Sequence, residues 1–243
     1  APRGRTVGLL FDLQGPSIRT GTLPEAFSLN EGDEVEFRCR DSEPRIPLST
    51  TVNYSGIIED VSEGDSLLVD NGSMIMRVKA IDEDRITCTV RTDGQLGSRR
   101  HINLPGVRLN LPALTEKDRA DIKLATECDA DFIAGSFVRD GEHVRELRAE
   151  IEQSGGHAQI ISKLEDQEAI KHLDDIVQAS DLVMVARGDL GIEVHIEELP
   201  IIQRRIVKRC HELGRRVIVA THLLESMIDN PTPTRAEVTD CAN

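Results

Sequence analysis

The 243 residues of this chain can bury a substantial core, arranged as one large domain or two small ones. Acidic side chains outnumber basic ones by 43 to 29, the net charge is -14, and aromatic residues make up only 2%. A nucleic-acid surface needs a basic field and stacking rings, so this composition argues against one. No apolar run approaches the roughly 20 residues of a membrane span, and no signal peptide is expected. The five cysteines are scattered without a Cys-x-x-Cys pair, which favours a reduced, cytoplasmic protein.

The chain opens with a nearly all-apolar run at residues 7–11, which predicts a strand buried on both faces. Asp12 stands at the exit of this strand, and Gln-Gly-Pro at 14–16 forces a turn. Arg19 follows at a distance that lets it return toward the strand exit. A solvated loop cation is the alternative interpretation of this residue.

From about Thr22 to Val107 the pattern changes to short alternating runs broken by turn residues, which predicts a β-rich insert. Asp-Asn-Gly at 70–72 is a strong hairpin signal, because Asn-Gly accepts the positive φ angles of a type I′ turn. Arg99 and Arg100 lie near the end of the insert. They are interpreted either as site residues or as surface charges at a hinge. The predicted strands of the insert are residues 34–38, 66–69, 74–78 and 85–90.

Beyond Pro112 helical and strand patterns alternate, which is typical of a parallel α/β architecture. Thr115 and Asp118 have the spacing of a capping box, so a helix is expected to start there and run toward Cys128. The other predicted elements are a strand at 131–137, helices at 141–153, 166–178 and 196–213, and strands at 160–165, 182–186 and 216–220.

Charged side chains stand at the ends of two of these strands. Lys163 and Glu165 alternate with Leu164, so they project to the same side, one pleat apart. Asp189 follows the next strand within a glycine-rich turn. Because neighbouring parallel strands end at one edge of the sheet, Glu165 and Asp189 can meet there. Two carboxylates and a lysine suit a magnesium-bound phosphate, although each residue alone is compatible with a solvated strand end.

Arg-Gly-Asp at 187–189 also occurs as an adhesion tripeptide or as a plain turn. An apolar strand before it and a glycine-rich turn after it make the adhesion interpretation unattractive.

Several stretches resemble the pyruvate kinase family, of the bacterial type, in order and over nearly the whole chain. They are Phe-Asp-Leu-Gln-Gly-Pro-Ser-Ile-Arg-Thr-Gly at 11–21, Asn-Leu-Pro-Gly at 103–106, Ile-Ile-Ser-Lys-Leu-Glu at 160–165, Val-Met-Val-Ala-Arg-Gly-Asp-Leu-Gly-Ile-Glu at 183–193, Val-Ala-Thr-His-Leu-Leu-Glu-Ser-Met at 219–227 and Asn-Pro-Thr-Pro-Thr-Arg-Ala-Glu at 230–237.

The resemblance implies roles for residues around the insert. Asp12 matches an aspartate that helps bind K⁺, and Arg19 matches an arginine that contacts nucleotide phosphate. Arg100 stands where the family carries a lysine on the nucleotide phosphates. Leu13 replaces a potassium-liganding threonine, and Ser17 replaces a glutamate or lysine. The potassium requirement is therefore left open.

The same resemblance places Lys163 against the transferring phosphoryl group and Glu165 and Asp189 on Mg²⁺. Backbone amides around Gly188 and Asp189 would receive the substrate carboxylate.

Ser136 matches a serine that lines the site, although a small residue packing inside a barrel explains it equally well. Thr221 matches a threonine near the enolpyruvate carbon that is protonated, whereas the residues alone favour a helix cap. His222 replaces a glutamine, and we expect it to contact residues of the site and not the substrate itself.

The implied fold is an α/β barrel of the (β/α)₈ type with an inserted β-barrel-like lid. It is incomplete, with about five of eight strands. We expect a barrel strand and the start of the lid hinge at 1–21, the lid at 22–107 and the truncated remainder of the barrel at 108–243. The first two strands, the last strand and the C-terminal domain of the family are not in this sequence. We expect these 243 residues alone neither to close a barrel nor to catalyse.

The implied function is phosphoryl transfer from phosphoenolpyruvate to ADP, with Mg²⁺ and K⁺ as candidate ions and a homo-oligomer, a tetramer by resemblance, as the assembly. Two alternatives stay open. One is a magnesium-dependent aldolase or lyase, which needs neither the lid nor Lys163 beside the metal. The other is a noncatalytic fragment that serves as a binding module.

Overall fold

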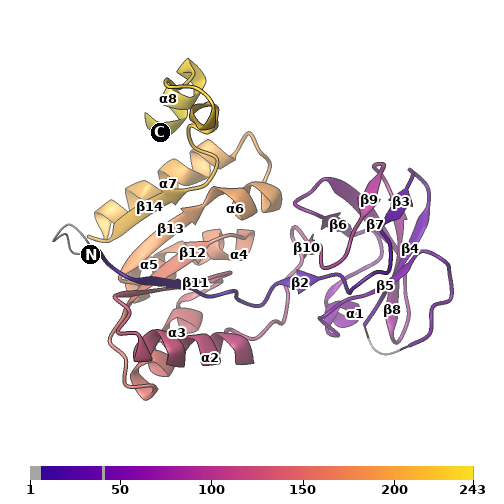
Figure 1. Cartoon of the computed structure of the whole chain (residues 1–243), viewed down its shortest axis with the longest axis horizontal. Coiled ribbons are helices and arrows are strands. Elements are labelled where there is room, and N and C mark those ends of the chain that lie inside the picture. The colour runs from indigo at the N-terminus through magenta and orange to yellow at the C-terminus, as the bar shows by residue number, and fades with distance from the viewer. Residues whose placement is uncertain (1–6, 40–41, 243) are drawn as a thin grey trace. The chain divides into compact units, whose positions relative to one another are not determined.

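The structure, a computed structural model, describes residues 7–39 and 42–242. The chain divides between Pro16 and Ser17, and again between Leu111 and Pro112, into two compact units (Figure 1). The second unit is the β-rich segment between the divisions, and the first is built from the segments on either side. These divisions stand a few residues from the boundaries that we predict after residues 21 and 107. The second unit starts earlier because β2 (Ile18–Arg19) already pairs with β10 (His101–Asn103).

The first unit contains one sheet of five parallel strands in the order β1-β11-β12-β13-β14. The strands are β1 (Leu10–Asp12), β11 (Phe132–Gly135), β12 (Gln159–Leu164), β13 (Leu182–Ala186) and β14 (Arg216–Ala220). Each strand pairs with the next one along this series, so their carboxyl ends lie at one edge. The prediction of five parallel strands in an incomplete barrel is confirmed.

Helices connect these strands and cover one face of the sheet (Figure 1). They are α2 (Glu116–Glu127), α3 (Gly141–Gln153), α4 (Gln167–Lys171), α5 (Leu173–Ala179), α6 (Arg187–Glu193) and α7 (Leu199–Glu212). The 3-10 turn η1 (Glu225–Ile228) and α8 (Arg235–Ala242) follow β14. The helix predicted at 166–178 is wrong in one respect, because it is divided at His172 into α4 and α5. α2 begins at Thr115 with the predicted capping box.

The two faces of the sheet differ because side chains alternate along each strand. Ile160, Leu164 and Val183 face the helices and belong to the main apolar core. Ile161 belongs to a smaller cluster on the opposite face, and Lys163, two residues farther along β12, projects to that side. The catalytic candidates of β12 therefore lie on the face that the helices leave uncovered.

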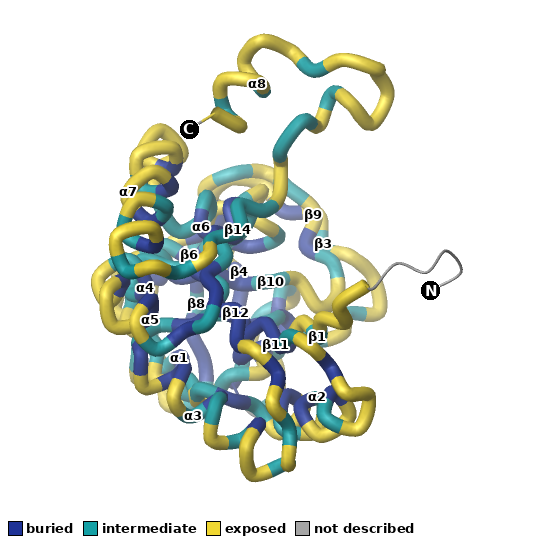
Figure 2. The backbone as a smooth tube through the Cα atoms, turned by 90° about the vertical axis from the view of Figure 1, so that its left-hand side faces the viewer, coloured by how far each residue is buried: buried dark blue, intermediate teal, exposed yellow. Residues whose placement is uncertain are grey.

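The prediction that the first strand is buried on both faces is wrong. The strand begins only at Leu10, and Val7, Leu9 and Leu10 are 76%, 43% and 40% exposed. Within the described residues β1 is an edge of the sheet and pairs only with β11, so nothing covers its other side. Figure 2 shows the contrast between this exposed segment and the buried β11 and β12.

The second unit is a seven-stranded sheet in the order β2-β10-β6-β7-β8-β4-β5, with a separate β3-β9 pair. Besides β2 and β10, its strands are β3 (Phe27–Leu29), β4 (Glu34–Arg38), β5 (Ser49–Thr51), β6 (Ser66–Val69), β7 (Met74–Ile81), β8 (Arg85–Val90) and β9 (Gly94–Leu96), and it has one short helix, α1 (Ile57–Asp60). The predicted hairpin joins β6 and β7, and Asn71 and Gly72 have φ angles of 56° and 78°. These are the positive values for which Asn-Gly is suited. Phe37, Met76 and Ile86 are fully buried at the centre of this unit's core.

Over the described ranges 7–39 and 42–242, no helix combines the length and the apolar character that a membrane crossing requires.

Candidate active site

Lys163 and Glu165 form an ion pair at the end of β12. Lys163 Nζ lies 3.2 Å from Glu165 Oε1. The Glu165 side chain is 1% exposed and the Lys163 side chain 15%. The pairing follows directly from the two-residue period of the strand, and the predicted arrangement of a cation beside an anion is confirmed.

Two neighbouring strands bring further polar groups to Lys163. Asp12 ends β1, and its Oδ1 lies 3.2 Å from Lys163 Nζ. Ser136 follows β11, and its Oγ accepts a hydrogen bond of 2.9 Å from the same ammonium. Ser136 in turn donates to the Leu13 carbonyl at 2.7 Å. Because β1, β11 and β12 are adjacent, their carboxyl ends fix the ammonium group between three oxygen atoms.

The second oxygen of Glu165 is held by the backbone. Phe137 N–H donates to Glu165 Oε2 at 2.6 Å, and Phe137 has a φ of 52°, in the left-handed region. A bulky residue in this region is uncommon and is typical of functional turns. The turn after β11 is therefore shaped to direct an amide at the carboxylate.

The electrostatic balance at Glu165 is unusual for an ion-paired carboxylate. The pKa of Glu165 is raised to about 7, mostly by burial and in smaller part by the charge of nearby Asp189. Lys163 and the Phe137 amide lower it, but they do not compensate for the burial. For Lys163, burial lowers the pKa, but the charges of Glu165 and Asp12 outweigh this effect and raise it.

This cluster fits a divalent cation. The described part of the chain contains no group of three or more His, Cys, Asp or Glu side chains arranged for a metal. Mg²⁺ does not need such a cage, because it is commonly held by one or two carboxylates together with water and substrate oxygens. A buried carboxylate whose pKa is raised, with a second carboxylate acting on it, gains most from an added positive charge.

Asp189 lies in a helix and not in the glycine-rich turn that we predict. α6 begins at Arg187, directly after β13, without a side-chain cap, and Leu190 is fully buried within it. Two glycines make its intrinsic helix propensity poor, so the tertiary packing of Leu190 overrides the local preference.

Thr221 contacts the start of α6 from the end of β14. Gly188 N–H donates to Thr221 Oγ1 at 2.8 Å, and this hydroxyl donates to the Ala220 carbonyl at 2.7 Å. Thr221 and His222 have φ angles of 70° and 53°. A β-branched residue with positive φ is strained, so the turn is held in place by its surroundings. A Cβ at position 188 would lie 3.3 Å from Thr221 Oγ1, so a larger residue there would press on this hydroxyl.

Arg187 is a residue whose role sequence reasoning missed. It is 8% exposed, with Nη2 2.6 Å from Asp240 Oδ2 of α8 and 3.3 Å from the His222 carbonyl. Its Nη1 is 3.4 Å from Gln203 Oε1. Arg187 thus links α6 to α7, to the turn after β14 and to α8. Its burial is incompatible with an adhesion tripeptide. The only sequence signal was its position directly after an apolar strand.

The structure assigns Leu13 a packing role. Its side chain is 2% exposed in the main core and has no ligand atom, and its carbonyl already accepts the Ser136 hydroxyl. The Leu13 side chain therefore offers no ligand for a potassium ion.

The two predicted nucleotide-binding arginines lie together in the second unit. Arg19 in β2 pairs with His101, and Arg100 immediately precedes that residue. Arg19 Nη1 donates to the Arg99 carbonyl at 3.2 Å, and Arg100 Nη1 lies 3.1 Å from Asp70 Oδ1. Both guanidinium groups therefore stand at one end of the β2–β10 pair.

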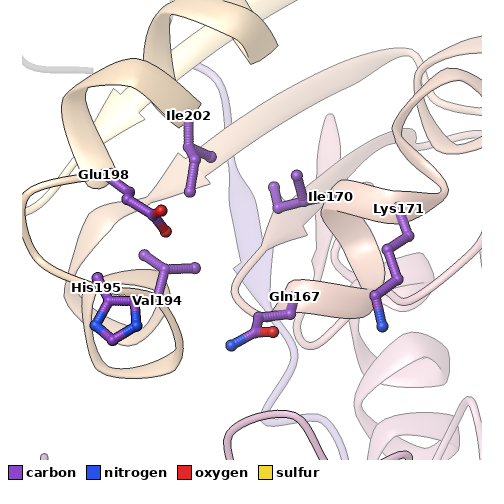
Figure 3. Close-up of a pocket in the computed structure, with 7 residues that line it drawn as sticks. All are labelled: Gln167, Ile170, Lys171, Val194, His195, Glu198 and Ile202. Carbon is purple, nitrogen blue, oxygen red and sulfur yellow. The ribbon is translucent and has the colours of Figure 1, made fainter.

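A separate hollow of about 300 Å³ lies between α4 and the segment that joins α6 to α7 (Figure 3). Ile170, Val194 and Ile202 form its apolar wall, and Lys171 and His195 stand on its rim (Figure 3). None of the predicted site residues lines it. This hollow is therefore separate from the polar cluster at the strand ends.

Parallel strands that alternate with helices, with polar and charged side chains gathered at their carboxyl ends, place the first unit in the α/β barrel class. A model of the pyruvate kinase barrel domain matches residues 2–243. Accordingly, the chain belongs to the pyruvate kinase family.

Curated relatives agree with this assignment. The chain is 45% identical to plastidial pyruvate kinase 2 of Arabidopsis thaliana over 99% of its length, covering 41% of that protein. It is 44% identical to pyruvate kinase of Geobacillus stearothermophilus, again over 99% of this chain and 41% of the relative. For pyruvate kinase of Clostridium perfringens the identity is 42%, over 97% of this chain and 50% of the relative. The chain thus spans about two fifths to one half of the length of these relatives.

Proposed function

We propose that the protein transfers a phosphoryl group from phosphoenolpyruvate to ADP and then protonates the enolpyruvate, giving pyruvate and ATP. Membership of the family is the observation that carries this proposal. The polar cluster of Lys163, Glu165, Ser136 and Asp12 at the strand ends supports it.

Phosphoryl transfer is catalysed mostly by positioning and by neutralising charge. In this proposal Lys163 lies against the transferring phosphoryl group, and Asp12, Ser136 and Glu165 hold its ammonium in place beforehand. A preorganised cation of this kind needs little reorganisation as charge develops on the phosphoryl oxygens.

Glu165 and Asp189 are the residues that would hold Mg²⁺, which neutralises and orients substrate oxygens when bound. A K⁺ ion near Asp12 is a further candidate, and the Lys163 ammonium already occupies part of the surroundings of that carboxylate. Arg19 and Arg100 would hold the nucleotide phosphates from the second unit.

Thr221 would stand beside the enolpyruvate carbon that receives the proton. Its hydroxyl is oriented by the Gly188 amide and the Ala220 carbonyl. In this proposal the backbone amides around Gly188 and Asp189 receive the substrate carboxylate, and the Gly188 amide also donates to Thr221.

The test is turnover by the protein at its natural length, supplied with phosphoenolpyruvate, ADP and Mg²⁺, with pyruvate formation coupled to a second enzyme. Pyruvate production that depends on ADP supports the proposal. Cleavage of a 2-oxo-acid adduct without nucleotide would instead assign an aldolase, and absence of both activities would leave the binding-module interpretation.

We further propose a cytoplasmic homo-oligomer. The scattered cysteines favour a reducing compartment. Cell fractionation and light scattering on the natural-length protein test the two parts separately.

A further inference from the structure

Two connections join the first unit to the second, and each carries a proline at the division. Pro16 is the last residue of the first unit before the division, and Pro112 is the first residue after the return. Proline fixes its own φ and has no N–H, so both crossing points begin with restricted backbone geometry.

The outgoing connection is bound to the first unit until the residue before Pro16. Leu13 N–H donates to the Ala134 carbonyl at 3.0 Å, which extends the pairing of β1 with β11. Gly15 N–H then donates to Asp118 Oδ1 at 3.1 Å. The chain is therefore fixed one residue before it leaves.

The returning connection is bound in the same way. The Pro112 carbonyl is 3.4 Å from Arg139 Nη2. The backbone N–H of Thr115 donates to Asp118 Oδ2 at 2.9 Å, and the Thr115 hydroxyl donates to the same oxygen at 2.6 Å. The chain is fixed again soon after it returns.

One carboxylate thus serves both connections, with a different oxygen for each. Asp118 is fully buried, so each of its bonds is formed away from competing water. Gly15 has a φ of +68°, and a side chain there would lie 3.0 Å from both the Cβ and the carbonyl oxygen of Ser136. Gly15 therefore lies against the Ser136 turn while its amide donates to Asp118.

A helix cap alone does not account for this arrangement. The capping box of α2 uses Thr115 and Asp118 Oδ2. The bond from Gly15, 103 residues away along the chain, lies outside the capping box. It also fixes the segment that begins with Asp12, whose carboxylate contacts Lys163.

We propose that Asp118 is a clamp that ties the two inter-unit connections together and thereby limits the motion of the second unit about the first, while keeping Asp12 at Lys163. Asp118 is a positioning residue in this role. The inference goes beyond the proposed phosphoryl transfer and does not depend on it, because its test measures conformation.

The experiment compares the natural-length protein with its Asp118→Ala variant. Hydrogen exchange is measured at the Gly15 and Thr115 amides. Distances between the units are measured by electron resonance between spin labels on Cys128 and on a cysteine introduced at the exposed Glu63, with Cys241 replaced by serine. We expect both amides to exchange at least about tenfold faster and the distance distribution to broaden.

Asp118→Asn serves if the alanine variant does not fold. The asparagine keeps one acceptor oxygen and places an NH₂ group against the other amide, so one of the two amides should keep its protection and the other should lose it. Glu116→Gln is the matched control, since Glu116 is exposed in the same helical turn. It should change neither measurement.

Two results would overturn the clamp. One is unchanged exchange at both amides in Asp118→Asn. The other is faster exchange within α2 alone, with the Gly15 amide and the distance distribution unchanged, which would reduce Asp118 to a helix cap.

Discussion

Each unit of the molecule buries a glutamate beside a basic side chain, and the pKa values of the two glutamates are shifted in opposite directions. Glu36 in the second unit is 2% exposed and lies 2.9 Å from Arg85 Nη1. Glu165 in the first unit is 1% exposed and lies 3.2 Å from Lys163 Nζ. Burial alone raises the pKa of both. For Glu36, hydrogen bonds from Ser49, Arg85 and the Arg45 amide outweigh it, and the pKa is lowered.

At Glu165 the effect of burial is larger than that of its hydrogen-bond donors and of Lys163. Asp189 adds a second negative charge nearby, and the pKa of Glu165 is raised to about 7. Protein donors are thus sufficient to stabilise the charged form of Glu36, whereas the charged form of Glu165 would be stabilised further by an added cation. The distance from each glutamate to its basic partner does not explain the difference in pKa, since the two ion-pair distances, 2.9 Å and 3.2 Å, are nearly equal.

The largest effect is expected from Lys163→Met in the natural-length protein. Losing a preorganised cation at the transferring phosphoryl group should lower kcat by two to three orders of magnitude, about 3–4 kcal/mol. Steady-state kinetics with phosphoenolpyruvate and ADP measure it, with circular dichroism to confirm the fold. Near-normal kcat in a folded variant would remove Lys163 from the reaction.

Arg85→Met should act on stability instead of catalysis. It leaves Glu36 buried without its principal cation, and we expect the Tm of the second unit to fall by roughly 10 °C or more. Differential scanning calorimetry gives the change. The exposed pair of Lys79 and Glu34 offers the control, because Lys79→Met should leave the Tm almost unchanged.

The two glutamates should also give opposite dependences of stability on pH. Without metal, the raised pKa of Glu165 means that the folded state binds more protons than the unfolded state between about pH 4.5 and 7. Its contribution to the free energy of unfolding therefore falls as pH rises through that window, by about 3 kcal/mol.

The lowered pKa of Glu36 has the opposite sign, since its contribution is present above the unfolded pKa and is lost as pH falls through the folded one. Urea unfolding across pH 2–8 for Glu165→Gln, Glu36→Gln and the parent separates the two, because the Glu36 window lies below about pH 4.5 and the Glu165 window above it. Parallel profiles in both variants would show that the electrostatic contrast is wrong.

Local patterns in the sequence predicted much of this arrangement. The two-residue period of β12 places Lys163 beside Glu165, and the Thr115 and Asp118 spacing marks the start of α2. Both relations depend on residues a few positions apart, where strand and helix geometry is nearly invariant.

The remaining features depend on contacts that the local pattern does not contain. Asp12 meets Lys163 across 151 positions of sequence. The Phe137 amide reaches Glu165 only because the backbone is left-handed there. The helix at Arg187–Glu193 forms against the local propensity of its glycines, through burial of Leu190. Tertiary packing decides each of these.

The metal-binding role of Glu165 and Asp189 is tested most directly by calorimetric titration of Mg²⁺ into the natural-length protein and its Glu165→Gln, Asp189→Asn and Glu36→Gln variants. We expect the first two variants to bind Mg²⁺ at least about tenfold more weakly, as when a ligand is lost, and Glu36→Gln to bind it like the parent. Unchanged Mg²⁺ affinity in both Glu165→Gln and Asp189→Asn would show that these carboxylates do not hold the metal.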